Sequence, residues 1–143
     1  MLITMMTMLA LAQEPEVTCD DPVSTVEIGI CMGRELEREQ ARQARYFAAV
    51  VERAEGLGDR IVGADGPEVA EALRAGQAAW EAYVQASCDA TYAWWSDGTI
   101  RGSKALGCRI DLTRQRTHEL WRAYLTYPDS TPPILPEPSG SAS

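Results

Sequence analysis

The sequence predicts an all-α protein, a small three-helix bundle with long helices that disulfide bonds staple together. Apolar residues recur at helical spacing in three stretches, no stretch alternates long enough to build a sheet, and the chain has four cysteines. Its 143 residues leave room for one domain with tails. We expect this domain at 13–127, after a signal peptide at 1–12 and before a disordered Pro/Ser-rich tail at 128–143.

The first helix is predicted to begin at Ser24 or Thr25, with Glu27 in its first turn, and to end near Leu57 before a glycine. Four arginines follow one stripe of this helix at i, i+4, i+8 and i+11: Arg34, Arg38, Arg42 and Arg45. Such a stripe is either an anion-binding face or a solvated face. We favour a solvated face, in which Glu35 pairs with Arg38 and Glu39 with Arg42 for ~0.2 to 0.5 kcal/mol each.

The second helix is predicted to follow Asp65 as its cap and Pro67 in its first turn, and to fail at Ser96-Asp97-Gly98. Its apolar face is expected to be the main seam of the core, and it carries Val69, Leu73, Trp80, Val84 and Cys88. The third helix is expected to begin only at Asp111 or Thr113 and to end before Pro128. Glycines are expected to keep the segment Trp94–Gly107 irregular.

The N-terminal segment indicates export. Residues 1–12 are uncharged and apolar and end in Ala10-Leu11-Ala12, a small-x-small pattern that signal peptidase accepts. The segment is too short to span a membrane, which needs ~20 apolar residues. The alternative is a helical or disordered N-terminus of a cytosolic protein. We expect a periplasmic or secreted protein with no stable membrane insertion after signal cleavage.

The cysteines agree with an oxidising compartment, because they form an even set without a Cys-x-x-Cys pair: Cys19, Cys31, Cys88 and Cys108. Three connectivities are possible, and the simplest pairs Cys19 with Cys31 and Cys88 with Cys108. A zinc site is not expected, since structural zinc ligands usually come in close pairs. A catalytic thiol is not expected either, because no histidine is near any cysteine.

The charge and the missing motifs exclude several functions. With 21 acidic and 13 basic residues the net charge is -8, so the chain does not offer the basic surface that nucleic acid requires. The sequence contains no Gly-rich phosphate loop, no serine-nucleophile motif and no cluster of metal ligands. We therefore predict a protein that is not an enzyme and uses no cofactor or metal.

Two segments carry a resemblance to a known family. The first runs from Leu73 through Gln77, Trp80 and Tyr83 to a cysteine, and the second, after another cysteine, reads Arg116-Thr117-His118-Glu119-Leu120. In order and spacing these segments resemble the LprI-like family, a domain named for a lysozyme inhibitor. The resemblance covers about Cys19 to Leu125, and it implies inhibition of a lysozyme in the bacterial envelope.

The residues of this motif also make sense as structural groups. We expect Gln77 to hydrogen-bond the backbone of a neighbouring helix while Trp80 fills the core. Arg116 is expected to pair with an acidic residue on the adjacent helix. His118 is expected to be a surface residue. Tyr83 broadens the apolar face of the second helix, and Leu120 lies on the apolar face of the third.

Two functions therefore stand side by side: binding and blocking a lysozyme, or a non-catalytic structural or interaction domain of the periplasm with another partner. If the chain inhibits a lysozyme, the contact is expected in the irregular segment, because binding residues often lie on loops that a rigid scaffold holds. The candidate contact residues are Trp94, Trp95, Asp97, Arg101 and Lys104. The tryptophans would act as aromatic anchors, although at least one of them is expected to be buried in the core. The two cations would reach the paired carboxylates of a glycosidase cleft.

Overall fold

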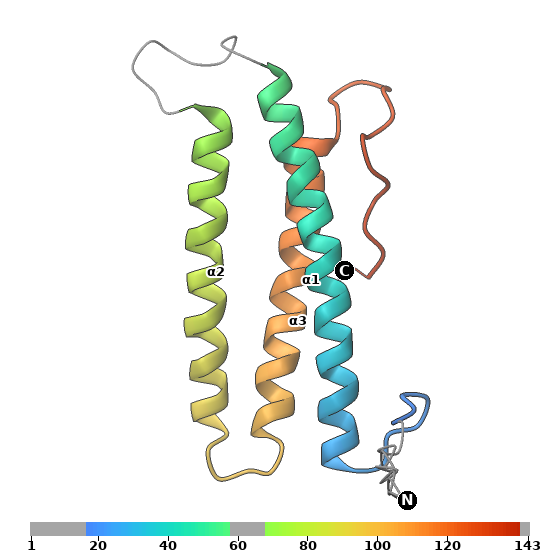
Figure 1. Ribbon diagram of the computed structural model, residues 1–143, viewed down its shortest axis with the longest axis vertical. Coiled ribbons are helices and arrows are strands. Elements are labelled where there is room, and N and C mark those ends of the chain that lie inside the picture. The colour runs from blue at the N-terminus through green and yellow to red at the C-terminus, as the bar shows by residue number, and fades with distance from the viewer. Residues whose placement is uncertain (1–16, 58–67, 141–143) are drawn as a thin grey trace, which may run out of the picture.

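The computed structural model describes residues 17–57 and 68–140 and confirms the all-α bundle (Figure 1). Its elements are α1 (Thr25–Leu57), α2 (Val69–Trp94), α3 (Arg101–Leu120) and a short π-helix, η2 (Trp121–Leu125). The three helices run up, down and up, and α3 packs against both α1 and α2, whereas α1 and α2 contact each other little. The predicted signal peptide and the predicted cap of the second helix at Asp65 and Pro67 lie outside the described residues.

α1 begins at Thr25, where the sequence predicted its start, and a reciprocal capping box fixes this end of the helix. The Ser24 hydroxyl accepts a hydrogen bond from the Glu27 amide at 3.1 Å, and the Glu27 carboxylate accepts the amides of Ser24 and Val23 at 3.0 Å each. The bonds from the Ser24 and Val23 amides hold the pKa of Glu27 below its ordinary value. None of the described helices is both long and apolar enough to cross a membrane.

The hydrophobic core lies between α1, the end of α3 and η2. Its centre consists of four buried side chains, Tyr46, Val50, Leu120 and Leu125. From α2 only Leu73 packs against this cluster, so the expectation that α2 supplies the main seam is wrong. Because α3 lies against both other helices, the apolar face of α2 is spread along α3 instead of meeting α1.

The third helix begins ten residues earlier than the sequence predicted. α3 starts at Arg101 and includes Gly102 and Gly107, so the segment between α2 and α3 is a turn of residues 95–100 and not an irregular stretch to Gly107. A helical glycine costs only about 1 kcal/mol relative to alanine, which tertiary packing readily outweighs. At Gly107 the packing is visible, since a Cβ there would lie 3.5 Å from the Met32 side chain of α1.

The proline-rich tail was expected to be disordered, whereas its described residues, 128–140, are extended and docked against the bundle. Residues 128–140 run back beside the bundle (Figure 1). The Tyr46 hydroxyl donates to the Pro136 carbonyl at 2.7 Å, and the Ile134 amide donates to the Leu125 carbonyl at 2.9 Å. Prolines keep their carbonyls as acceptors, so a chain that cannot form a helix can still dock through them.

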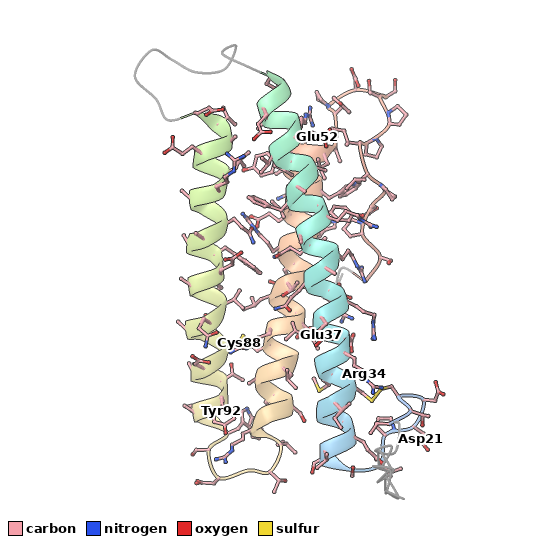
Figure 2. The ribbon with its side chains drawn as sticks, viewed as in Figure 1. Asp21, Arg34, Glu37, Glu52, Cys88 and Tyr92 are labelled. Carbon is pink, nitrogen blue, oxygen red and sulfur yellow. A yellow bond between two sulfur atoms is a disulfide. The ribbon has the colours of Figure 1, made fainter. Side chains whose placement is uncertain are left out.

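The two disulfides have the simplest of the three possible connectivities, in which each cysteine bonds to its neighbour in the sequence. Cys19 bonds to Cys31 and Cys88 bonds to Cys108, and each pair has a Cα–Cα distance of 5.6 Å (Figure 2). The first bond ties the N-terminal segment to α1, where Arg34 also donates to the Val17 carbonyl at 2.6 Å. The second bond joins α2 to α3.

Candidate functional site

The turn between α2 and α3 is a tightly hydrogen-bonded connection. The Trp95 amide donates to the Thr91 carbonyl at 3.3 Å, and the Gly98 amide donates to the Trp95 carbonyl at 2.9 Å. On the far side, the Lys104 amide donates to the Ile100 carbonyl at 3.0 Å as α3 begins. These bonds satisfy the backbone groups that helix ends leave free, so the turn has a defined shape.

Large apolar side chains in the turn and at the end of α2 are exposed to solvent. Trp94 is 86% exposed, and Tyr92, Trp95 and Ile100 are exposed as well. Trp94 and Trp95 are thus both surface residues in the described structure, so the expectation that at least one of them is buried in the core is wrong. Both rings are available as aromatic anchors. Tryptophan and tyrosine dominate the energetics of protein interfaces when they become buried there.

Two cations at the start of α3, Arg101 and Lys104, each lie over one of these rings. The Lys104 ammonium is 5.0 Å from the centre of the Trp95 ring, and the Arg101 guanidinium is 5.1 Å from that of Tyr92. Arg101 also donates to the Ser96 carbonyl at 2.9 Å. These contacts hold long, flexible cations in place above apolar rings. Asp97, the remaining predicted contact residue, is exposed in the same turn.

The turn is braced directly behind its exposed surface. The fully buried Cys88 is bonded to Cys108, and Arg109 of α3 pairs with Asp89 of α2 at 3.2 Å. This brace lies one to two helical turns from the rings, and Figure 2 shows Cys88 above Tyr92 on α2. The surface therefore belongs to a stiff support, which reduces the entropy lost on binding.

Apolar surface continues from the turn onto the start of α1. A cavity of about 450 Å³ between the starts of α1 and α3 is lined by Ile28, Met32, Ile100 and the Lys104 side chain, among others. Val23, Val26 and Ile30 are exposed beside the start of α1. Exposed apolar patches of this kind mark interaction surfaces in soluble proteins. We define the binding end as residues 92–104 together with 23–32.

Comparison with known proteins assigns the chain to a family. The family described as "Lysozyme inhibitor LprI" matches residues 19–120, which span all four cysteines and all three helices. The chain belongs to the LprI family. An uncharacterized protein of Rhizobium meliloti is 30% identical over 113 residues, which cover 78% of this chain and 81% of that protein. No solved structure matches this chain.

The LprI motif has both buried and open members. Leu120 is fully buried in the core, and Gln77 is buried between the helices. Gln77 was expected to hydrogen-bond the backbone of a neighbouring helix, but it donates to side chains instead. Its acceptors are Gln43 at 3.4 Å and Glu81 at 3.1 Å. The long Gln77 side chain reaches across the space between α1 and α2 because those helices do not pack closely there.

Three other motif residues lie outside the core of this LprI-family chain. Trp80 is half-buried and takes no part in the core cluster, and Tyr83 is exposed, so the expectation that Trp80 fills the core is wrong. Arg116 bonds to Glu119 of its own helix at 3.0 Å and to Gln77, and not to an acid on the adjacent helix. At i, i+3 spacing the local carboxylate is already within reach.

The arginine stripe of α1 is only partly paired as predicted. Glu39 pairs with Arg42 at 2.7 Å, but Glu35 pairs with Arg114 of α3 instead of Arg38. Arg114 also bonds to Glu39 at 3.2 Å. Desolvation lowers the pKa of Arg114, but the hydrogen bonds and charges of Glu39 and Glu35 outweigh it, so the pKa is raised overall. Arg114 was not among the predicted residues, although it lies one helical turn from Ile110 and Thr117, which are both buried.

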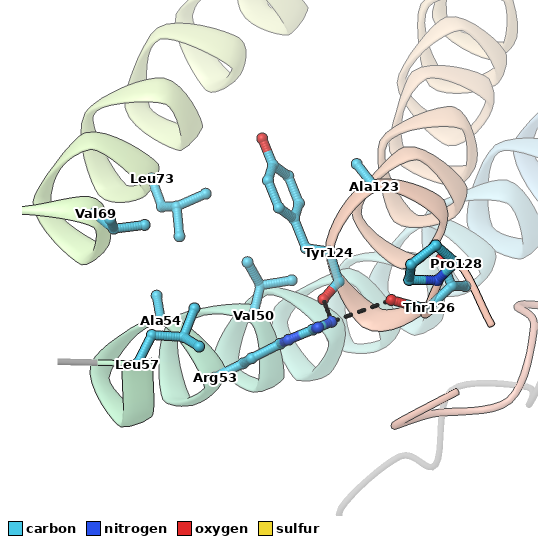
Figure 3. Close-up of a pocket in the computed structure, with 10 residues that line it drawn as sticks. All are labelled: Val50, Arg53, Ala54, Leu57, Val69, Leu73, Ala123, Tyr124, Thr126 and Pro128. Carbon is cyan, nitrogen blue, oxygen red and sulfur yellow. Dashed lines mark hydrogen bonds between the residues drawn. The ribbon is translucent and has the colours of Figure 1, made fainter. Parts of the chain in front are cut away.

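A second apolar cavity, of about 410 Å³, lies at the opposite end of the bundle (Figure 3). Leu73 and Val69 of α2 face Val50 of α1 across it, and Tyr124 of η2 forms a third wall. Arg53 donates to the carbonyls of Tyr124 and Thr126, the latter at 3.3 Å, and so caps the end of the helical chain. Arg53 is the one cation that lines this cavity, and it is already bonded to backbone carbonyls. The cavity is therefore less suited to a charged partner than the binding end.

The described residues contain no group of histidine, cysteine and acidic side chains that could hold a metal ion. His118, the single histidine, lies 3.4 Å from Glu137 of the tail and stacks 5.5 Å from the Trp121 ring. The chemistry available at the binding end is recognition, through rings and cations that a rigid scaffold presents.

Proposed function

We propose that this LprI-family chain acts outside the cytoplasm, after removal of residues 1–12, and binds a lysozyme through the binding end so that the lysozyme cleft is blocked. The observation that carries the proposal is the pairing of exposed rings with cations at the turn: Lys104 over Trp95 and Arg101 over Tyr92. The family match supports the lysozyme as partner.

The chemistry of the turn suits a glycosidase cleft. Such clefts hold two carboxylates on either side of the scissile bond, and arginine or lysine side chains form charge-assisted hydrogen bonds with carboxylates. Arg101 and Lys104 lie close together on the first turn of α3, and the neighbouring aromatic surface would be buried around them. Burial of the rings would exclude water and strengthen the ion pairs.

The charge of the whole chain supports fast association. The net charge of -8 would steer the chain toward a basic lysozyme, while the two cations are concentrated at the contact itself. The binding role needs no catalytic group in this chain, because blocking the cleft is sufficient for inhibition.

The test is a cell-wall lysis assay with c-type, g-type and invertebrate lysozymes, in which the inhibition constant of the mature chain is compared with that of two double variants. Arg101→Ala with Lys104→Ala removes the cations of the turn. Arg38→Ala with Arg74→Ala removes the same charge from exposed positions elsewhere. Loss of buried charge contacts costs roughly 2 to 5 kcal/mol, so the first variant should weaken inhibition about 30-fold or more.

The control variant should inhibit within about threefold of the wild type, because rim and surface charges contribute little. Equal weakening in both variants would show that net charge, and not the turn, drives binding. If the wild type inhibits none of the three lysozyme types, the lysozyme proposal is wrong and the binding end serves another envelope partner.

A further inference from the structure

Three motif side chains that the lysozyme proposal does not use gather at one place. Trp80 and Tyr83 of α2 and Arg116 of α3 line an open cavity of about 400 Å³ between these helices. The cavity lies halfway along the bundle, away from the turn, and its other walls are Leu112, Gln115, His118, Glu119 and Arg122.

The two aromatic residues of this cavity are not explained by packing. Trp80 lines a second cavity as well, so its indole separates two open spaces. Tyr83 is 57% exposed. Within the described part of the chain, neither the Trp80 indole N–H nor the Tyr83 hydroxyl forms a hydrogen bond. Both residues therefore offer a ring face and a free polar group to a ligand.

Arg116 is held in a fixed position on the floor of the cavity. Its Nε donates to the buried Gln77 Oε1 at 3.3 Å, and its Nη1 donates to Glu119 Oε2 at 3.0 Å. The guanidinium lies 6.0 Å from the centre of the Trp80 ring, and its side chain is only 14% exposed. A guanidinium has five N–H donors, so donors remain free after these two bonds.

The lining is rich in donors and has one acid. Glu119 is already bonded to Arg116, and Glu137 of the tail lies 3.4 Å from His118. The Arg122 side chain has no hydrogen-bond partner among the described residues, and neither has the Gln115 amide. The lining thus has two arginines against one carboxylate, with Glu137 beside it, in a chain whose net charge is -8. The cavity is richer in cations and free donors than the chain as a whole.

We propose that this cavity binds an anionic sugar, a pyranose ring that carries a carboxylate. The carboxylate would bind Arg122 and the free donors of Arg116, since guanidinium and carboxylate geometries match. The C–H face of the ring would lie on Trp80 and Tyr83, because aromatic faces are negative and attract polarised hydrogens. The cavity volume lies within the range of small-molecule sites.

The experiment uses the mature chain and follows its indole N–H signals by nitrogen-15 NMR, with Trp80→Phe to assign the signal of Trp80. The probes are methyl glucuronide against methyl glucoside, and N-acetylmuramic acid against N-acetylglucosamine. Each pair differs by the group that carries the carboxylate, and the two acids represent a free uronic acid and a wall-type sugar. Binding of either acid, with the neutral partner much weaker, is the expected result and identifies the source.

Arg122→Gln should weaken binding of the acid about tenfold, because it removes a charge-assisted hydrogen bond. Arg101→Gln at the start of α3 is the matched control, since it makes the same substitution at an arginine that does not line this cavity, and it should leave sugar binding unchanged. Arg122→Gln should leave inhibition of lysozyme unchanged, which separates this proposal from the first.

Several results would overturn the proposal. These are equal binding of the acid and neutral sugars, no shift of the Trp80 signal with either acid, or unchanged affinity in Arg122→Gln. If sodium acetate shifts the Trp80 signal as much as the sugars do, the site recognises a carboxylate alone and the sugar part of the proposal is wrong.

Discussion

The indole N–H of Trp121 donates a 3.0 Å hydrogen bond to the backbone carbonyl of Leu135, which joins the end of the bundle to the proline-rich tail. The side chain of Leu135 packs against the core cluster, and Pro138 is buried. The tail also carries Ser139, whose carbonyl accepts a hydrogen bond from Arg42 of α1. The tail is therefore a covering layer for the side of the core that α2 does not reach.

Removal of residues 128–143 should destabilise the domain. The deletion removes the partners of Tyr46 and Trp121 at about 1 kcal/mol each and exposes the surface that Leu135 covers. We expect a loss of about 3 kcal/mol, which lowers the melting temperature by roughly 10 °C in thermal circular dichroism. A control that lacks only residues 141–143 should melt like the full chain. An unchanged melting temperature in the longer deletion would mean that the tail does not contribute.

Gly102→Ala should stabilise the protein. In the structure Gly102 lies inside α3, and a Cβ there meets nothing within 4 Å, so alanine gains helix propensity of ~0.5 to 1 kcal/mol without a clash. Chemical denaturation with circular dichroism detects a change of this size. Gly98→Ala is the comparison, because Gly98 is in the turn and its Cβ would lie 3.4 Å from the Trp95 carbonyl. If Gly102→Ala destabilises, α3 begins later than Arg101.

The two disulfides should differ in their effect on stability. Replacement of Cys88 and Cys108 by alanine opens a loop of 20 residues and should cost about 3 kcal/mol in the chain-entropy model, with a further loss because Cys88 is buried. The same change at Cys19 and Cys31 opens a loop of 12 residues at an exposed end of the chain and should cost less. Urea unfolding of both variants gives the comparison, and the reverse order would contradict the structural assignment.

Glu39→Gln should destabilise the bundle although it changes one atom. Glu39 is 4% exposed, and one of its oxygens accepts hydrogen bonds from Arg42 at 2.7 Å and Arg114 at 3.2 Å. Loss of its charge leaves two arginines with a weaker acceptor, which we expect to cost about 1 to 3 kcal/mol. Glu37→Gln, at an exposed position of the same helix, should change the free energy of unfolding by less than about 0.5 kcal/mol. If Glu39→Gln and Glu37→Gln changed the free energy of unfolding equally in urea, the bonds of Glu39 to Arg42 and Arg114 would not stabilise the bundle.

The bounds of α1 could be predicted because their signals are local. A capping box needs residues three positions apart, and the two glycines close together at 56 and 58 break a helical pattern. The start of α3 could not be predicted in this way. The glycines at 102 and 107 favour a loop by intrinsic propensity, whereas the structure places both inside α3, where Gly107 lies against Met32 of α1 and Cys108 is bonded to Cys88.

The sequence identified residues of the candidate site but not their arrangement in space. Trp95, Arg101 and Lys104 were identified from the chemistry of a segment that was expected to be a long loop. The structure makes this segment a short turn and a helix start, and the helical turn is what brings Lys104 back over Trp95. The open position of Trp80 was not visible in the sequence, because apolar spacing alone does not say which neighbour a helix face will meet.

The sequence by itself determined the all-α fold, the ends of the first helix and the LprI family, because each depends on residue type and short-range spacing. It left three disulfide connectivities open, and the structure decided for the local pairing. The tertiary structure alone decided where α3 begins, that the tail covers the core, that Glu35 and Glu39 share Arg114, and that Trp80 and Tyr83 face a cavity. Each of these depends on which surfaces meet across long sequence separations, where packing outweighs local preferences of about 1 kcal/mol.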